Sequence, residues 1–221
     1  MNTAQQEAGK VKSMNIKIYR PFEIIEGWYM QNSTSHCALL LPPNPALGGT
    51  IANAVLKAVN DAFISLGFST LRIRYRSSSN ENREHDQQDA GEALDWLVSK
   101  GAEYICVGGY GYGATVAVHT ALRKPDSNAF IAISPNITTE FNSLTPCPSG
   151  LVLTAEHENT FEHVKSIFSS LLLKKGASIE YSNVAGANHL YTGYLPEIYA
   201  KVCAYLKDSL KQSEAPGQKV A

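Results

Sequence analysis

Cysteine is scarce in this sequence and follows no pattern that is typical of disulfides or metal sites. The 221 residues contain four cysteines, far apart and without a C-x-x-C pair: Cys37, Cys106, Cys147 and Cys203. Three of them fall within predicted strands or helices, where a free cysteine behaves as a small hydrophobic residue. We therefore predict reduced, mostly buried thiols in an intracellular protein, and no disulfide framework.

Neither charge nor hydrophobicity is concentrated in one segment. Lysine and arginine number 19, and aspartate and glutamate 20, so with a formal net charge of −1 we expect neither nucleic acid nor an anionic membrane as partner. No segment approaches the roughly 18 consecutive apolar residues of a membrane span. The first ten residues lack the apolar core of a signal peptide. These absences predict a soluble protein of the cytoplasm or an organelle matrix.

The sequence does contain an alternation of strand-like and helix-like segments. Apolar and β-branched runs predict strands at 15–19, 22–30, 36–41, 69–75, 104–107, 129–133, 151–155 and 178–182. Helical spacing predicts one helix that Thr50 caps and Gly67 stops, one that Gly101 stops, one from the turn after 107 to about 122, one over about 160–175 that Gly176 stops, and one from about 192.

This alternation predicts the α/β fold class, with a mostly parallel central sheet flanked by helices. We expect one domain over 14–211, between small, polar and flexible ends at 1–13 and 212–221. The segment 134–149 between two predicted strands is too short for a cap or lid domain.

Residues 105–117, ICVGGYGYGATVA, predict a strand, a glycine-packed turn and an apolar helix. The same order surrounds a G-x-S-x-G nucleophile elbow, in which the serine attacks the substrate. Here the five residues are Gly109-Tyr110-Gly111-Tyr112-Gly113, so Gly111 occupies the position of the serine. Acyl transfer needs an oxygen or sulfur nucleophile, and Gly111 has no side-chain atom that could be acylated.

Four further segments occur in order around this turn: LLLPPNPALGGTIAN at 39–53, STLRIRYR at 69–76, LVLTAEHE at 151–158 and VAGANH at 184–189. Together they resemble the small, lidless α/β-hydrolases related to dienelactone hydrolases and short-chain esterases, over about 37–205. The resemblance implies a single-domain α/β-hydrolase fold without a cap domain. It also implies a site in the order nucleophile, acid, histidine, at Gly111, Glu158 and His189.

The chain departs from that family's pattern at positions that belong to the family's active site. Asn44 replaces the second histidine of the H-P-H-P turn, and Glu158 stands where aspartate is commoner. The polar segment 77–82 replaces a glycine-rich turn. The Tyr112 amide is expected to serve an oxyanion, with Asn44 as a further binding residue, whereas Pro45 in the facing turn has no N–H to donate. Ligand binding is therefore expected to persist without covalent turnover.

Three hypotheses follow. The first is a pseudoenzyme that acts as a binding or structural subunit, with protein partners or as a homo-oligomer, and with a small acyl or ester-like ligand. The second is a serine esterase or thioesterase whose nucleophile has been replaced by Gly111, naturally or by engineering. The third is weak hydrolysis in which His189 and Glu158 activate water directly.

Two other patterns resemble cofactor sites and fail in context. Gly109-x-Gly111-x-x-Ala114 matches a dinucleotide fingerprint, but it lies in mid-sheet and the next strand ends without the required acid. Between His157 and His163, an H-E-x-x-H metal site would need histidine at 161, which is Phe161. We expect no metal and no other cofactor. Tyr110, Tyr112, Tyr191 and Tyr194 are predicted to pack rather than line a pocket.

Overall fold

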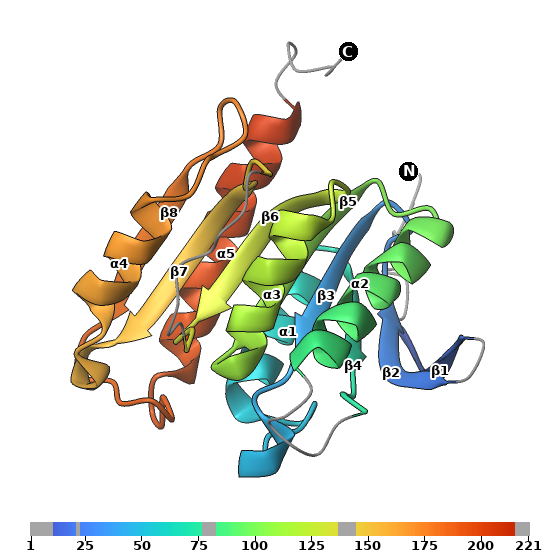
Figure 1. The fold of residues 1–221 in the computed structure, drawn as a ribbon, viewed down its shortest axis with the longest axis horizontal. Coiled ribbons are helices and arrows are strands. Elements are labelled where there is room, and N and C mark those ends of the chain that lie inside the picture. The colour runs from blue at the N-terminus through green and yellow to red at the C-terminus, as the bar shows by residue number, and fades with distance from the viewer. Residues whose placement is uncertain (1–10, 21–22, 77–82, 137–144, 215–221) are drawn as a thin grey trace, which may run out of the picture.

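The structure is a computed structural model, and it describes residues 11–20, 23–76, 83–136 and 145–214 (Figure 1). Its strands form one sheet in the order β1-β2-β4-β3-β5-β6-β7-β8. Their bounds are β1 Lys12–Tyr19, β2 Ile24–Gln31, β3 His36–Leu41, β4 Ser69–Ile73, β5 Tyr104–Tyr110, β6 Ser127–Ile133, β7 Ser149–Ala155 and β8 Ile179–Val184. The β1–β2 and β2–β4 pairs are antiparallel, and all pairs from β4 to β8 are parallel.

Helices cover both faces of this sheet. They are α1 Ala54–Ser65, α2 Arg83–Ser99, α3 Tyr112–Arg123, α4 Phe161–Ser169 and α5 Leu195–Glu214. The helices α2, α3 and α4 pack on one face, and α1 and α5 on the other (Figure 1). The predicted α/β class, with a mostly parallel sheet between helices, is confirmed. Within the described residues no element forms a cap domain over the sheet.

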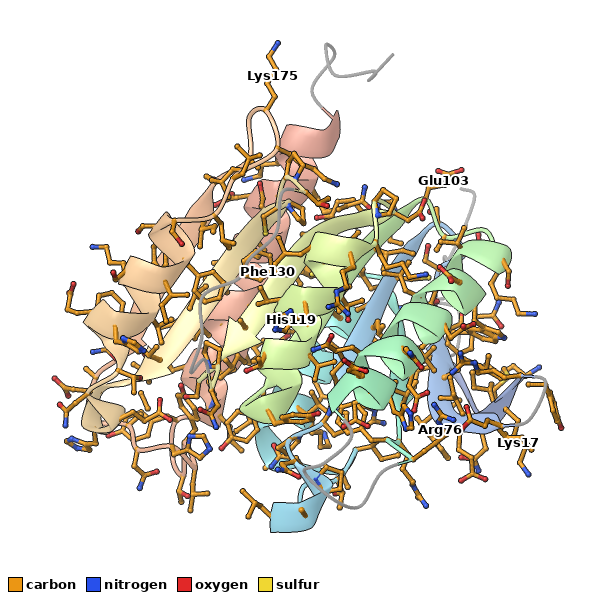
Figure 2. The ribbon with its side chains drawn as sticks, in the orientation of Figure 1. Lys17, Arg76, Glu103, His119, Phe130 and Lys175 are labelled. Carbon is orange, nitrogen blue, oxygen red and sulfur yellow. The ribbon has the colours of Figure 1, made fainter. Side chains whose placement is uncertain are left out.

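The apolar strand β3 shows why the sheet needs two helical layers. Its alternate residues Ala38 and Leu40 are buried against α1 and α5, whereas Leu39 and Leu41 are buried against α2 and α3. Side chains fill both interfaces, and Phe130 (labelled in Figure 2) stacks on Phe168 of α4 with ring centroids 5.8 Å apart. A continuous apolar strand is therefore buried on both faces, as its sequence predicts.

The prediction that the cysteines are free, buried thiols is confirmed for all four, Cys37, Cys106, Cys147 and Cys203. Burial raises the pKa of the Cys37 thiol to about 11 and that of Cys147 to about 12. In the part of the chain that the structure describes, no helix has the length and apolar character needed to cross a membrane.

The predicted cap of the first helix is wrong. Asn53 caps α1 instead of Thr50, because its Oδ1 accepts hydrogen bonds from the N–H groups of Val55 and Leu56 at 2.9 and 3.2 Å. Thr50 lies one turn earlier, and its Oγ1 accepts from the Ala52 N–H at 3.2 Å. Both residue types are good caps, so residue type alone does not separate the two positions.

The helix predicted over 160–175 is too long, because α4 ends at Ser169. The chain beyond it becomes extended and pairs with Cys147, which donates to Leu172 and accepts from Lys174 at 2.7 and 2.8 Å. Gly176 therefore has its positive φ in a turn before β8, not at the helix end. The other two predicted stops, Gly67 and Gly101, are confirmed with φ of 87° and 90°.

Other boundaries differ by a few residues. The central strand β5 continues through the glycine pair to Tyr110 rather than ending at 107, because these residues pair with β3 and β6. The last helix begins at Leu195, since a turn that includes Gly193 precedes it. The strand β1 begins at Lys12 and α5 runs to Glu214, so regular structure extends slightly beyond the predicted domain 14–211. The rest of the predicted flexible ends lies outside the described residues.

Candidate functional site

The strand–turn–helix elbow forms as predicted between β5 and α3. Gly111 joins them with φ 57° and ψ −120°, a conformation that glycine adopts readily and other residues rarely do. Its N–H donates to the Ile133 carbonyl at 2.8 Å, and its own carbonyl accepts from Ala114 at 3.1 Å. The turn is therefore held from both sides, by β6 and by the first turn of α3.

The glycines on either side of this turn permit close approach of the backbone. A Cβ on Gly109 would lie 2.2 Å from the carbonyl oxygen of Gly113, and a Cβ on Gly113 would lie 2.2 Å from that of Leu41. At Gly111, in contrast, a Cβ would meet nothing closer than 3.9 Å. Packing thus requires glycine at the two flanking positions but not at 111.

Glu158 and His189 lie beside this turn at the carboxyl edge of the sheet. Glu158 ends the short 3-10 helix η2 (Glu156–Glu158) after β7, and His189 lies in the loop after β8. The Nδ1 atom of His189 is hydrogen-bonded to Oε1 of Glu158. Nε2 on the other side of the ring lies 3.9 Å from the position of a Cβ on Gly111. The structure therefore brings together the three positions that the resemblance implied.

The carboxylate of Glu158 has further partners, which the sequence did not indicate. Its Oε2 accepts from the Ser134 hydroxyl at 2.6 Å and from the Ala155 N–H at 3.1 Å. The Ser134 hydroxyl also lies 2.8 Å from the hydroxyl of Tyr191. The one available signal for Ser134 is its position directly after β6, at the edge where the other site residues gather.

These contacts set the protonation of the pair. Burial alone would raise the pKa of Glu158, but hydrogen bonds from His189, Ser134 and the Ala155 amide outweigh it and lower the pKa below the ordinary value. The hydrogen bond to Glu158 raises the pKa of His189 above the ordinary value, against the smaller effect of burial. The arrangement favours an imidazolium–carboxylate pair.

Backbone strain is concentrated at the same place. In the described residues, three non-glycine residues have positive φ: Ser134 at 44°, Asn159 at 54° and Tyr191 at 52°. Ser134 and Tyr191 are the hydroxyl residues behind Glu158, and Asn159 follows Glu158 in the chain. Such conformations cost on the order of 1–3 kcal/mol each and persist where the surroundings determine them.

A cleft of about 630 Å³ opens beside the elbow. Gly111, Glu158 and His189 line it, together with the polar residues Asn53, Thr160 and His163. Two leucines that also line the cleft are largely exposed, Leu47 at 84% and Leu190 at 68%. The cleft thus joins a polar site at the dyad to apolar side chains in contact with solvent.

The predicted binding residues Tyr112 and Asn44 both line this cleft. The side-chain oxygen of Asn44 accepts from the Ala46 N–H at 2.9 Å and caps the 3-10 helix η1, Pro45–Leu47. The turn residue that faces Gly111 is Pro43, whose Cβ lies 4.0 Å from a Cβ on Gly111. Pro43, like the expected Pro45, has no N–H to donate.

The tyrosines follow the packing prediction only in part. Tyr110 and Tyr191 are buried, at 3% and 0% exposure, whereas Tyr112 is half-buried. Tyr110 and Tyr112 nevertheless line the cleft. The Tyr110 hydroxyl donates to the His189 carbonyl at 2.6 Å, and its ring lies 5.2 Å from the imidazole. Tyr110 therefore supports the loop that carries the histidine.

No group of three or more His, Cys, Asp or Glu side chains within the described ranges could hold a metal ion. The predicted departure at 77–82 lies outside the described residues.

Comparison with known proteins defines the class. The chain has the α/β-hydrolase fold and is similar over nearly its whole length to solved members of the α/β-hydrolase superfamily. An uncharacterized protein of Rickettsia prowazekii (strain Madrid E), RP471, is a relative with 30% identity over 194 residues, which cover 80% of this chain and 81% of RP471. No protein-family model matches the chain.

Solved structures agree with this assignment. ATU1826 from Agrobacterium tumefaciens, a protein of unknown function described as an α/β-hydrolase, superposes with a TM-score of 0.78 at 27% identity, over 93% of this chain and 100% of its own. XC6422 from Xanthomonas campestris, a serine hydrolase family member without a lid, gives 0.74 at 14% identity, over 95% and 99%. The second likeness shows the fold alone.

Proposed function

We propose that this protein is a catalytically degenerate α/β-hydrolase that binds a small ligand through a carbonyl or carboxylate group beside Gly111. The observation that carries the proposal is a glycine in the elbow where acyl transfer requires a nucleophile. An acyl-enzyme cannot form at this position. The protein therefore acts as a binding subunit and not as an acylating enzyme.

The surroundings of Gly111 support an oxygen-bearing ligand. The helix α3 begins directly after Gly111, and the amino end of a helix favours a negative or partially negative oxygen. His189 lies across the same space, and its hydrogen bond to Glu158 favours the protonated, donating form of the ring. The exposed side chains of Leu47 and Leu190 would contact an apolar substituent of that ligand.

Calorimetry with short fatty acids and their methyl esters tests this proposal. The expected result is binding that His189→Gln weakens about tenfold, because a charge-assisted hydrogen bond contributes about 1.5–3 kcal/mol. The exposed His157, in η2, provides a matched control, and His157→Gln should leave binding unchanged. Turnover of p-nitrophenyl esters well above buffer, sensitive to His189→Gln, would contradict the proposal.

A second candidate is direct activation of water by His189. The specific observation in its favour is the position of Nε2, which faces the space that a side chain at 111 would occupy and that glycine leaves open. A water there could pass its proton to a neutral imidazole that Glu158 orients. This candidate predicts slow hydrolysis with a basic limb that follows deprotonation of His189. A covalent intermediate seen by mass spectrometry would exclude it.

The third candidate, an active serine hydrolase with its nucleophile replaced, is supported by the space at Gly111. The nearest atoms to a Cβ there are at 3.9–4.0 Å, which is ordinary van der Waals contact. The discriminating experiment is the Gly111→Ser variant treated with a fluorophosphonate probe. Absence of labelling would count against this candidate.

The proposal includes a role in an assembly or a homo-oligomer. Its support is the exposure of Tyr19 and Ile24, at 75% and 42%, where β1 and β2 approach their connection. The four buried thiols support an intracellular location. Sedimentation velocity of the purified chain tests self-association. A monomer at micromolar concentration would contradict the homo-oligomer and restrict the proposal to an assembly with other proteins.

A further inference from the structure

The hydrogen bonds of the site extend past the Glu158–His189 dyad into the core. Ser134 contacts Glu158, and Tyr191 contacts Ser134, so four side chains form one connected series. We propose that Ser134 and Tyr191 are positioning residues that hold the Glu158 carboxylate and, through it, the His189 ring. The inference rests on the proposed function only in taking His189 as the group that faces the ligand.

The number of available protons gives the series a direction. An ionised carboxylate only accepts, so the single hydroxyl proton of Ser134 is donated to Oε2 of Glu158. The contact of 2.8 Å between Ser134 and Tyr191 must then use the proton of Tyr191. Both hydroxyls therefore donate toward Glu158, as do the Ala155 N–H and His189 Nδ1–H. Aligned donors polarise one another and stabilise the charge at the end of the series.

Burial indicates that the series is a fixed part of the site. Tyr191 is 0% exposed and Ser134 is 5% exposed. The Tyr191 hydroxyl has a partner in Ser134, 57 residues away in the chain, whereas the buried hydroxyls of Tyr75 and Tyr205 have none among the described residues. The ring of Tyr191 also packs edge-on against Tyr110, with centroids 6.3 Å apart. Tyr110 in turn donates to the His189 carbonyl, so both sides of the dyad are held.

The backbone supports the same conclusion. Ser134 and Tyr191 both adopt positive φ, which side-chain-bearing residues avoid unless the surroundings require it. The Ser134 N–H donates to Leu153 at 2.7 Å, and the Tyr191 N–H donates to Asn188 at 2.9 Å. These bonds hold the backbone at both positions, from which the Ser134 hydroxyl reaches Glu158 and the Tyr191 hydroxyl reaches Ser134. A role limited to core packing would require neither the hydroxyls nor their alignment.

The test is titration of Glu158 and His189 by NMR in the ligand-free protein, with the signals assigned through Glu158→Gln and His189→Gln. The variants are Ser134→Ala and Tyr191→Phe, each of which removes one hydroxyl. Alanine retains the Cβ of serine, so the demand on the backbone at 134 stays the same. Removing a donor from the charged form should shift the Glu158 midpoint to higher pH, more for Ser134→Ala than for Tyr191→Phe.

Matched controls are available elsewhere in the core. Ser127, at the other end of β6, and Tyr205, in α5, are buried, and their hydroxyls make no hydrogen bond to the described site residues. Ser127→Ala and Tyr205→Phe therefore remove the same atoms away from the dyad. They should leave both midpoints unchanged, whatever their effect on thermal unfolding.

Midpoints in Ser134→Ala and Tyr191→Phe that equal those of the controls, or that move to lower pH, would overturn the inference. Tyr191→Phe keeps the ring that fills the core, so the test stands if Ser134→Ala does not fold. Failure of the proposed function looks different. It appears as absence of ligand binding in the native protein, with the Glu158 shifts still present in the two variants.

Discussion

The Nε2 atom of His189 lies 3.9 Å from the position that a Cβ on Gly111 would occupy. A serine hydroxyl at 111 would therefore come within hydrogen-bonding reach of the imidazole, whose Nδ1 is already bonded to Glu158. The His189–Glu158 pair that would activate a serine is therefore formed. The residue at the position of that serine is a glycine, which has only a hydrogen atom as its side chain.

The variant Gly111→Ser should become reactive toward a fluorophosphonate probe. The added side chain fits the space, but φ of 57° makes the substitution cost about 1–3 kcal/mol in the free energy of unfolding. His189→Gln in this background should slow ester hydrolysis by about 10²–10⁴-fold, because general-base assistance is lost. Gly111→Ala is the control, with the same strain and no hydroxyl. Labelling of the alanine variant would show that the probe reacts elsewhere.

The flanking glycines should respond differently from Gly111. Gly113→Ala would place a Cβ 2.2 Å from the Leu41 carbonyl oxygen, so α3 and β3 would have to separate. We expect a loss of more than about 3 kcal/mol, or failure to fold, as for other severe overpacking. Gly48→Ala, with positive φ but no atom within 4 Å, should cost about 1 kcal/mol. Denaturant unfolding of both variants measures the difference, and equal losses would contradict the packing explanation.

The dyad should make stability depend on pH in two directions. The lowered pKa of Glu158 contributes stability that is fully present above the unfolded value of 4.5 and is lost as the pH falls through the folded value. The raised pKa of His189 contributes stability that is fully present below 6.5 and is lost as the pH rises through the folded value. Both contributions are therefore complete between about pH 4.5 and 6.5. Relative to the native protein, His189→Gln should therefore lose most free energy of unfolding in this pH window. Urea unfolding of both proteins across pH measures the difference. A loss that does not vary with pH would contradict this prediction.

Tyr112 should stabilise a buried carboxylate behind the elbow. Its hydroxyl donates to Oδ2 of Asp86 at 2.7 Å, and Asp86 is 3% exposed. Burial raises the pKa of Asp86 in spite of this bond. Tyr112→Phe should lower the free energy of unfolding at pH 7 by about 1–3 kcal/mol, and by less in acid, where Asp86 is neutral. Tyr75→Phe removes a buried hydroxyl with no hydrogen-bond partner among the described residues, so its loss should be smaller.

Much of this fold could be predicted because its signals are local and repeated. Continuous apolar strands and glycine-terminated helices identify the βα units, and the spacing of 111, 158 and 189 places each residue after a different strand of one sheet edge. The cap at Asn53 and the end of α4 could not be predicted. Both depend on contacts with other segments, such as the bridge between Cys147 and Leu173.

The support of the dyad also escapes prediction from sequence. Ser134 and Tyr191 are common residue types with no flanking motif, and they meet only because β6 and the loop after β8 end at the same edge. Positive φ at a serine or tyrosine leaves no mark in the sequence either, since these residues rarely adopt it. Three-dimensional proximity, rather than spacing along the chain, identifies them.

The four buried cysteines have a practical consequence for the elbow. Thiols in such positions react slowly with alkylating reagents, because the reagent cannot reach the buried sulfur. A cysteine introduced by Gly111→Cys would lie in the open cleft beside His189 and would be the one accessible thiol of the protein. The native chain thus offers no competing accessible thiol when a fluorophore or spin label is attached at position 111.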